Sequence, residues 1–133
     1  LAQAAEGHGS LVTLVGEPGL GKTRLMTEAA RLAGARGAQV LWSQVIEDPV
    51  APPFLPWRLA LRDAVLDDDV AALREDLGSG AGEVAEIVPE LRDRLGLPHV
   101  PAVASGSAAR FPLFDAVARF LLARARRRPL VLL

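Results

Sequence analysis

The order of apolar and polar positions predicts a chain in which short buried strands alternate with helices. Three apolar runs have the length and the aliphatic, partly β-branched composition of strands buried on both faces, at residues 11–15, 39–43 and 130–133. A turn-rich segment at 16–23 separates the first two runs and passes into a helical pattern from Thr23. Strand, loop, helix and strand form one βαβ unit, for which a parallel sheet is the default.

The region between the second and third strands has the periodicity of amphipathic helices joined by loops. Prolines or glycines indicate loops at 47–56 and 97–107 and a flexible break at 78–82. Helices are expected after Pro56, from the Asp67–Asp69 turn to Leu77, over 83–95 with a restart at Pro89, and over 111–127; Gly34 is expected to cap the first helix. The apolar stripes that should face the core are Trp57, Leu61, Ala64 and Val65 in one helix and Phe114, Val117, Ala118, Leu121, Leu122 and Ala125 in the last.

Composition narrows the class of protein to a single globular domain. Half of the 133 residues are hydrophobic, 23% are charged, and the formal net charge is −1, which argues against disorder and against a basic nucleic-acid-binding surface. No apolar run approaches the length of a membrane span, and no export leader opens the chain, so we expect a cytoplasmic protein without membrane contact. The absence of cysteine excludes disulfides and thiolate chemistry. An initial leucine in place of methionine suggests a piece of a longer chain.

The strongest candidate for chemistry is the string GEPGLGKT at 16–23, which matches the pattern G-x-x-x-x-G-K-[ST]. Glycines let main-chain N–H groups approach a triphosphate, and the following helix directs the positive end of its dipole at the same anion. Lys22 is the only lysine in the chain, and it is expected to reach the β- and γ-phosphates as the catalytic residue. Thr23 would complete the shell of a magnesium ion. The predicted ATP-binding residues are Gly16, Glu17, Pro18, Gly19, Leu20, Gly21, Lys22, Thr23 and Arg24.

Weaker candidates are better explained by packing or by solvation. Trp42 and Trp57 fit core or loop packing better than stacking on a base, and Glu47 and Asp48 fit a solvated loop better than contact with magnesium-bound water. The arginines at the end of the last helix favour the negative end of its dipole, so a solvated helix end is expected; these are Arg124, Arg126, Arg127 and Arg128. Phosphate sensing by Arg110 is the less favoured interpretation, and His8 and His99 are expected at the surface.

Several segments together resemble the AAA-type ATPase module of bacterial STAND proteins, which include large LuxR-type transcriptional regulators and other multidomain signalling ATPases. The segment SLVTLVGEPGLGKTRLMTEAARLA is similar to that family's phosphate-binding region. Further similarity lies in APPFLPW at 51–57, IVPELRDRL at 87–95, RFPLFDAV at 110–117 and RPLVLL at 128–133. The last of these is similar to the lead-in to the Walker B strand.

The resemblance implies a three-layer α/β/α P-loop NTPase fold with a mostly parallel sheet, incomplete over residues 1–133. The family's G-R-E segment would precede this chain, and its Walker B acids would follow Leu133. The family's sheet order also places a later strand between the first and third strands, so apolar edges would be uncovered. The isolated segment is therefore expected to be inactive and poorly stable.

The resulting hypothesis is that the intact protein binds ATP and hydrolyses it slowly with Mg²⁺, as a nucleotide switch in a bacterial signalling or transcriptional regulator. Its expected partners are ATP and ADP, other domains of the same polypeptide, and further copies in an oligomer, without direct nucleic-acid contact by these residues. A P-loop small-molecule kinase is one alternative, although the arginine run is badly placed for a lid. A nucleotide-binding scaffold without turnover is the other.

Overall fold

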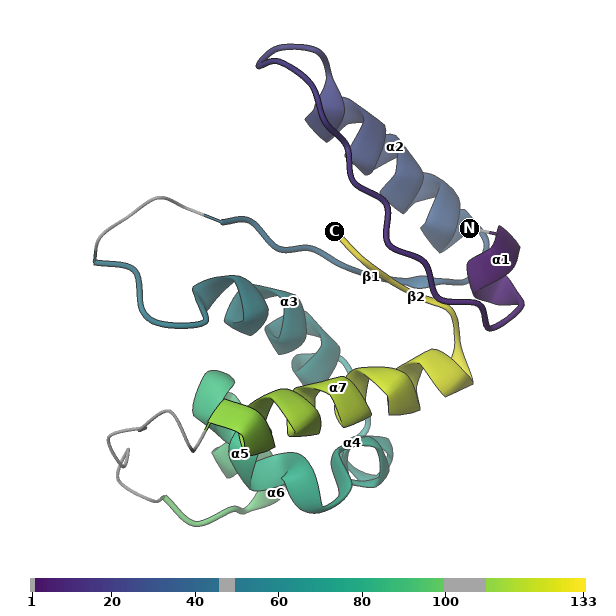
Figure 1. Ribbon diagram of the computed structural model, residues 1–133. Helices are drawn as coiled ribbons and strands as arrows, with labels where there is room; N and C mark the ends of the chain where they lie inside the picture. Colours follow the sequence, from purple (N-terminus) through teal and green to yellow (C-terminus); the bar gives the residue numbers. More distant parts are fainter. Residues whose placement is uncertain (1, 46–49, 100–109) are drawn as a thin grey trace.

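The computed structural model of the chain describes residues 2–45, 50–99 and 110–133 (Figure 1). Helices dominate this part of the chain, and two short strands form a small sheet. The elements in order are α1 (Ala2–Ala5), α2 (Lys22–Ala35), β1 (Gln39–Leu41), α3 (Leu55–Leu66), α4 (Val70–Leu77), the 3₁₀ helix η1 (Gly78–Gly80), α5 (Ala81–Ile87), α6 (Glu90–Leu95), α7 (Arg110–Arg127) and β2 (Leu130–Leu132).

The second and third predicted strands are β1 and β2, and they pair in parallel as expected, with Gln39 opposite Leu130 and Leu41 opposite Leu132. Hydrogen bonds from the Leu133 amide to the Leu41 carbonyl (2.9 Å) and from the Ser43 amide to the Leu133 carbonyl (2.7 Å) continue the pairing. The crossover between the strands carries the helices from α3 to α7. The sheet thus joins the two ends of this helical region.

The prediction of a buried strand at 11–15 is wrong. The segment is extended but unpaired, and the side chains of Leu11 and Val15 are 95% and 91% exposed. In the described part of the chain β1 and β2 pair only with each other, so segment 11–15 adds no strand to the sheet. The segment instead passes beside α2 in the view of Figure 1. The predicted βαβ unit therefore lacks its first strand. This agrees with the sheet order that the resemblance implies, in which a later strand lies between the first and third strands.

The core lies among α3 to α7, with Leu41 of β1 as its contribution from the sheet. Leu61, Ala64 and Val65 of α3 are buried as predicted, whereas Trp57 remains partly exposed. The face predicted for α7 is largely wrong. Of the predicted stripe only Val117 is fully buried, and Phe114 and Leu122 are exposed. The side chains that α7 does bury are Leu113, Ala116, Val117, Phe120 and Arg124. Both faces of α7 are apolar, so periodicity alone did not distinguish them.

Local chemistry explains the ends of several helices. Asp69 caps α4 by accepting hydrogen bonds from the amides of Ala71 (2.9 Å) and Ala72 (3.3 Å), as the acidic turn predicts. Pro89 precedes α6, which confirms the predicted restart. The cap expected at Gly34 is wrong, because α2 continues to Ala35 and Gly37 adopts the left-handed conformation at φ +81°. The amides of Gly37 and Ala38 then bond to the carbonyls of Gly34 and Ala33.

The glycine-rich segment at 78–82 is folded, which corrects the expectation of a flexible break. It forms η1 and the start of α5, and Gly80 is buried against α7. A Cβ at Gly80 would lie 2.9 Å from the Cβ of Ala116, so only glycine permits this approach of the two segments. The glycines therefore serve close packing at Gly80 rather than mobility.

Candidate functional site

The glycine loop, defined here as residues 16–21, leads directly into α2. Three residues separate α2 from β1, and the two elements pack against each other, so they run in opposite directions. The N-terminus of α2 therefore lies toward the carboxyl end of β1, where ligands bind in open parallel sheets. Figure 1 shows the loop at the end of α2 farthest from the turn into β1.

Two glycines give the loop its shape. Gly19 and Gly21 have φ angles of +85° and +79°, which other residues adopt at a cost, and Gly21 is the N-cap residue of α2. The Leu20 amide bonds to the Glu17 carbonyl at 3.4 Å. No atom lies within 4 Å of an ideal Cβ at Gly19 or Gly21, so the main chain there is open to a ligand. Residues 16–21 are all exposed.

Lys22 folds back over the glycine loop. Its Nζ donates hydrogen bonds to the carbonyls of Gly16 and Glu17, both at 2.7 Å. An ammonium group has three donors, and a third N–H remains after these two bonds. The side chain thus bridges the beginning of the loop to the first helical turn and holds a positive charge at the loop. The motif predicts Lys22 at this site but does not predict its contacts with the loop carbonyls.

The first turn of α2 brings Thr23 and Arg24 to the same end as Lys22, and both side chains are exposed. Amides at the start of a helix have no acceptor within the helix, and the helix dipole is positive there. The Leu25 amide is the first to bond back, to the Gly21 carbonyl at 3.0 Å. The amides of Lys22, Thr23 and Arg24 therefore remain for an anion.

Farther along α2, the surface carries an ion pair between Arg31 and Glu28, with 2.6 Å between Nη2 and Oε1. Hydrogen bonding from Arg31 lowers the pKa of the Glu28 carboxyl below its ordinary value. Glu28 is therefore ionised at neutral pH and paired, one turn beyond the first turn of the helix. The end of α2 that faces the glycine loop carries no acidic residue in its first turn.

These observations fit a polyphosphate group. The loop provides open main chain, consecutive helix N-terminal amides and one ammonium group, all of which favour negative charge. Lys22 would hold the terminal phosphates, and the Thr23 hydroxyl is the candidate magnesium ligand. When bound, a magnesium–triphosphate group supplies an electrophilic phosphorus and metal-assisted charge neutralisation.

The weaker candidates fall into three groups. Glu47 and Asp48 lie outside the described residues, as does the side chain of Arg110, the residue that begins α7. Trp42 and Trp57 are 41% and 39% exposed, so of the two predicted roles, core or loop packing, the core role is wrong. His8 and His99 are at the surface, as predicted.

Arg124 overturns the prediction of a solvated arginine run at the end of α7. Its side chain is 5% exposed and forms an ion pair with Asp68, while its Nη1 lies 3.8 Å from Asp76 Oδ2. Its Nε and Nη2 donate to Gln39 Oε1 at 3.0 and 2.8 Å. Arg124 follows Phe120 by four residues, so the two lie on the same face of α7. This spacing is the sequence signal that could have indicated the burial of Arg124. Arg124 therefore connects β1 to α4.

The described residues contain neither a metal-ligating cluster nor a membrane-spanning helix. No group of three or more histidine, aspartate or glutamate side chains there is arranged to hold a metal ion. Within the same residues, no helix combines the length and apolar character needed to cross a bilayer.

Comparison with protein families gives one match over the whole chain. The family model described as the AAA ATPase domain matches residues 1–133. Comparison with curated proteins and with solved structures gives no match.

Proposed function

The chain belongs to the AAA ATPase domain family, and we propose that it binds ATP with Mg²⁺ at residues 16–24. The family is associated with ATP binding and hydrolysis and implies a P-loop NTPase fold. The small parallel sheet and its neighbouring helices are consistent with part of such a fold. The residues that bind ATP, the hydrolysis of ATP and the biological use of that hydrolysis are what we propose beyond the family.

The observation that carries the proposal is the contact of Lys22 with the glycine loop. Its two hydrogen bonds to the carbonyls of Gly16 and Glu17 hold the loop closed on one side. With these carbonyls engaged by Lys22, the loop amides and the helix N-terminus are left to meet the phosphates. The third ammonium N–H supplies a direct charge-assisted hydrogen bond to a phosphate oxygen. The same side chain thus organises the loop and binds the ligand.

We further propose that the intact protein hydrolyses ATP slowly and uses it as a switch in a bacterial signalling or transcriptional regulator. A two-state response needs an element that the nucleotide holds in one arrangement. Segment 11–15 joins the glycine loop directly, is unpaired, and exposes most of its apolar side chains. Its exposed side chains leave it free to move when the nucleotide changes.

The kinase alternative needs an arginine-rich lid over the phosphates. Arg124 is buried and pairs with Asp68, and Arg127 pairs with Glu75 at 2.8 Å and with Asp76 at 3.0 Å, so these two side chains are already engaged within the helical region. This placement favours the ATPase over the kinase. Release of labelled phosphate from γ-labelled ATP by the intact protein separates a hydrolase from a scaffold that binds without turnover.

The central test replaces Lys22 in the intact protein. Lys22→Ala should abolish retention of a labelled, non-hydrolysable ATP analogue, because both the charge and the bridge across the loop are lost. Arg36→Ala removes an exposed cation at the other end of α2 and should leave retention unchanged. Undiminished retention by Lys22→Ala would contradict the assignment of the site.

A further inference from the structure

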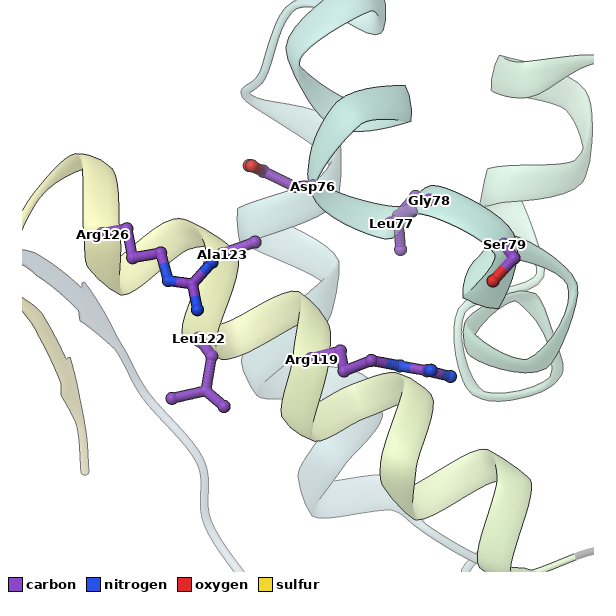
Figure 2. A pocket seen from close by; sticks show the side chains of 8 residues that line it. All are labelled: Asp76, Leu77, Gly78, Ser79, Arg119, Leu122, Ala123 and Arg126. Atoms are coloured by element: carbon purple, nitrogen blue, oxygen red, sulfur yellow. The ribbon is translucent and has the colours of Figure 1, made fainter.

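A hollow of about 340 Å³ lies between α7 and the segment that joins α4 to α5 (Figure 2). Arg119 and Arg126 project from α7, and Asp76, Leu77 and Ser79 form the opposite wall. The two arginines are seven residues apart, so they lie on one face of the helix, about 10 Å apart along its axis. The hollow shares no residue with the glycine loop.

The hollow is held open by contacts at both of its ends. At one end Asp76 pairs with Arg127, with 3.0 Å between Oδ1 and Nε, and at the other Gly80 packs directly on Ala116. The residues between Asp76 and Gly80 therefore form an arch fixed to α7 on either side. The hollow between this segment and α7 is open to solvent, and its volume lies at the lower end of the range for small-molecule sites.

The uncompensated charge in the hollow is positive. Asp76 is the acidic residue of the lining. Its Oδ1 pairs with Arg127, while its buried Oδ2 accepts no hydrogen bond and lies 3.8 Å from Arg124 Nη1, so the carboxylate has a cation on each oxygen's side. Arg119 has one exposed ion pair, at 2.9 Å to Asp115. Arg126 forms no hydrogen bond or ion pair with any residue in the described ranges, although its side chain lines the hollow. Its guanidinium is available to a ligand.

The remaining lining is apolar or weakly polar. Leu77, Leu122 and Ala123 supply hydrocarbon surface, and Ser79 adds one hydroxyl. We propose that this hollow binds a small organic anion with a phosphate or carboxylate head on Arg126 and Arg119 and an apolar body against these residues. Guanidinium groups bind such heads through paired hydrogen bonds, and the hydrocarbon wall selects against a bare inorganic ion.

Calorimetric titration of the intact protein with phenyl phosphate tests the proposal, with benzyl alcohol as a neutral compound of similar shape. To separate this site from the glycine loop, the titration is repeated with the Lys22→Ala variant, which should bind phenyl phosphate equally well. Arg126→Ala should weaken binding by about tenfold or more, because a charge-assisted hydrogen bond is lost. Benzyl alcohol should bind at least about tenfold more weakly than phenyl phosphate for the same reason.

Arg128→Ala is the matched control, since it removes a neighbouring exposed arginine that does not line the hollow. The affinity of this variant for phenyl phosphate should stay within about twofold of that of the unsubstituted protein. Arg126 is itself exposed, so its replacement leaves the fold intact, which circular dichroism verifies. Three results would each overturn the proposal. They are equal losses of affinity for phenyl phosphate in Arg126→Ala and Arg128→Ala, loss of phenyl phosphate binding in Lys22→Ala, and no binding of phenyl phosphate at about 10 mM. ATP retention by Arg126→Ala should be unchanged, so the two proposals fail separately.

Discussion

The helical region from α3 to α7 and the region from residue 2 to 45 are built in different ways. The helical region contributes every member of the core cluster except Leu41, and its helices bury leucines, valines and Phe120 against one another. In the other region the aliphatic side chains are mostly exposed, and Ala33 and Leu41 are its buried residues within the described part of the chain. Stability in the first region comes from tertiary burial, and shape in the second comes from local hydrogen bonds and backbone angles.

The difference explains why the candidate site keeps its geometry in a region with little core. The glycine loop depends on two positive φ angles, the cap of α2 and the bonds of Lys22 to two carbonyls, all within a few residues of each other. Such interactions need no distant partner. A region of few buried contacts is also the one that opens most readily, which suits a segment that must respond to a nucleotide.

Matched leucine substitutions give the largest expected contrast between the two regions. Leu91→Ala in α6 removes a fully buried side chain and should lower the free energy of unfolding by about 3–5 kcal/mol. Leu11→Ala removes an exposed side chain and should change it by less than about 0.5 kcal/mol. Urea-induced unfolding monitored by circular dichroism measures both. Equal losses would show that segment 11–15 is packed in solution and would remove the contrast.

Arg124→Ala tests whether the polar link between the two regions stabilises the fold. The change leaves Asp68 without this partner and removes the donors to Gln39 of β1, so stability should fall by about 2–3 kcal/mol. Arg128→Ala, at an exposed residue just past the end of α7, is the control and should have little effect. Chemical denaturation of both variants makes the comparison. A negligible loss in Arg124→Ala would mean that β1 is held by its pairing with β2 and by apolar packing alone.

Substitutions of two glycines near the start of α5 should change stability by smaller amounts and in opposite directions. Gly80→Ala places a methyl group 2.9 Å from the Cβ of Ala116 and should cost about 1–2 kcal/mol. Gly82→Ala meets no atom within 4 Å inside α5 and should stabilise the protein by about 0.5–1 kcal/mol. Thermal unfolding distinguishes opposite shifts. Stabilisation by both substitutions would show that η1 does not sit tightly on α7.

Features set by short-range chemistry could be predicted from the sequence. The cap at Asp69, the restart of a helix after Pro89 and the helix that begins at the glycine loop all depend on residues within one or two turns. The existence of β1 and β2 and their parallel orientation were also predictable, because both runs are apolar and a helical crossover joins them. The residue types and spacing of the candidate site are of the same local kind.

Features that depend on distant partners could not be predicted in the same way. The run at 11–15 has the composition of a strand, yet pairing needs a neighbouring edge that local sequence does not specify. In α7, apolar residues occupy two faces, and contact with α4 and α5 decided that Phe120 is buried and Phe114 is half exposed. The burial of Arg124 required Asp68, Asp76 and Gln39 to come together from other elements.

By itself, the sequence determined the glycine loop with its single lysine, the helix that follows, and the propensity of each later segment, because these depend on backbone freedom, capping and nearby periodicity. The tertiary structure alone decided which face of α7 is covered, which arginine is neutralised, and that the arch from Asp76 to Gly80 leaves a hollow. These outcomes result from the packing of elements far apart in the chain, where burial and charge pairing outweigh local preference.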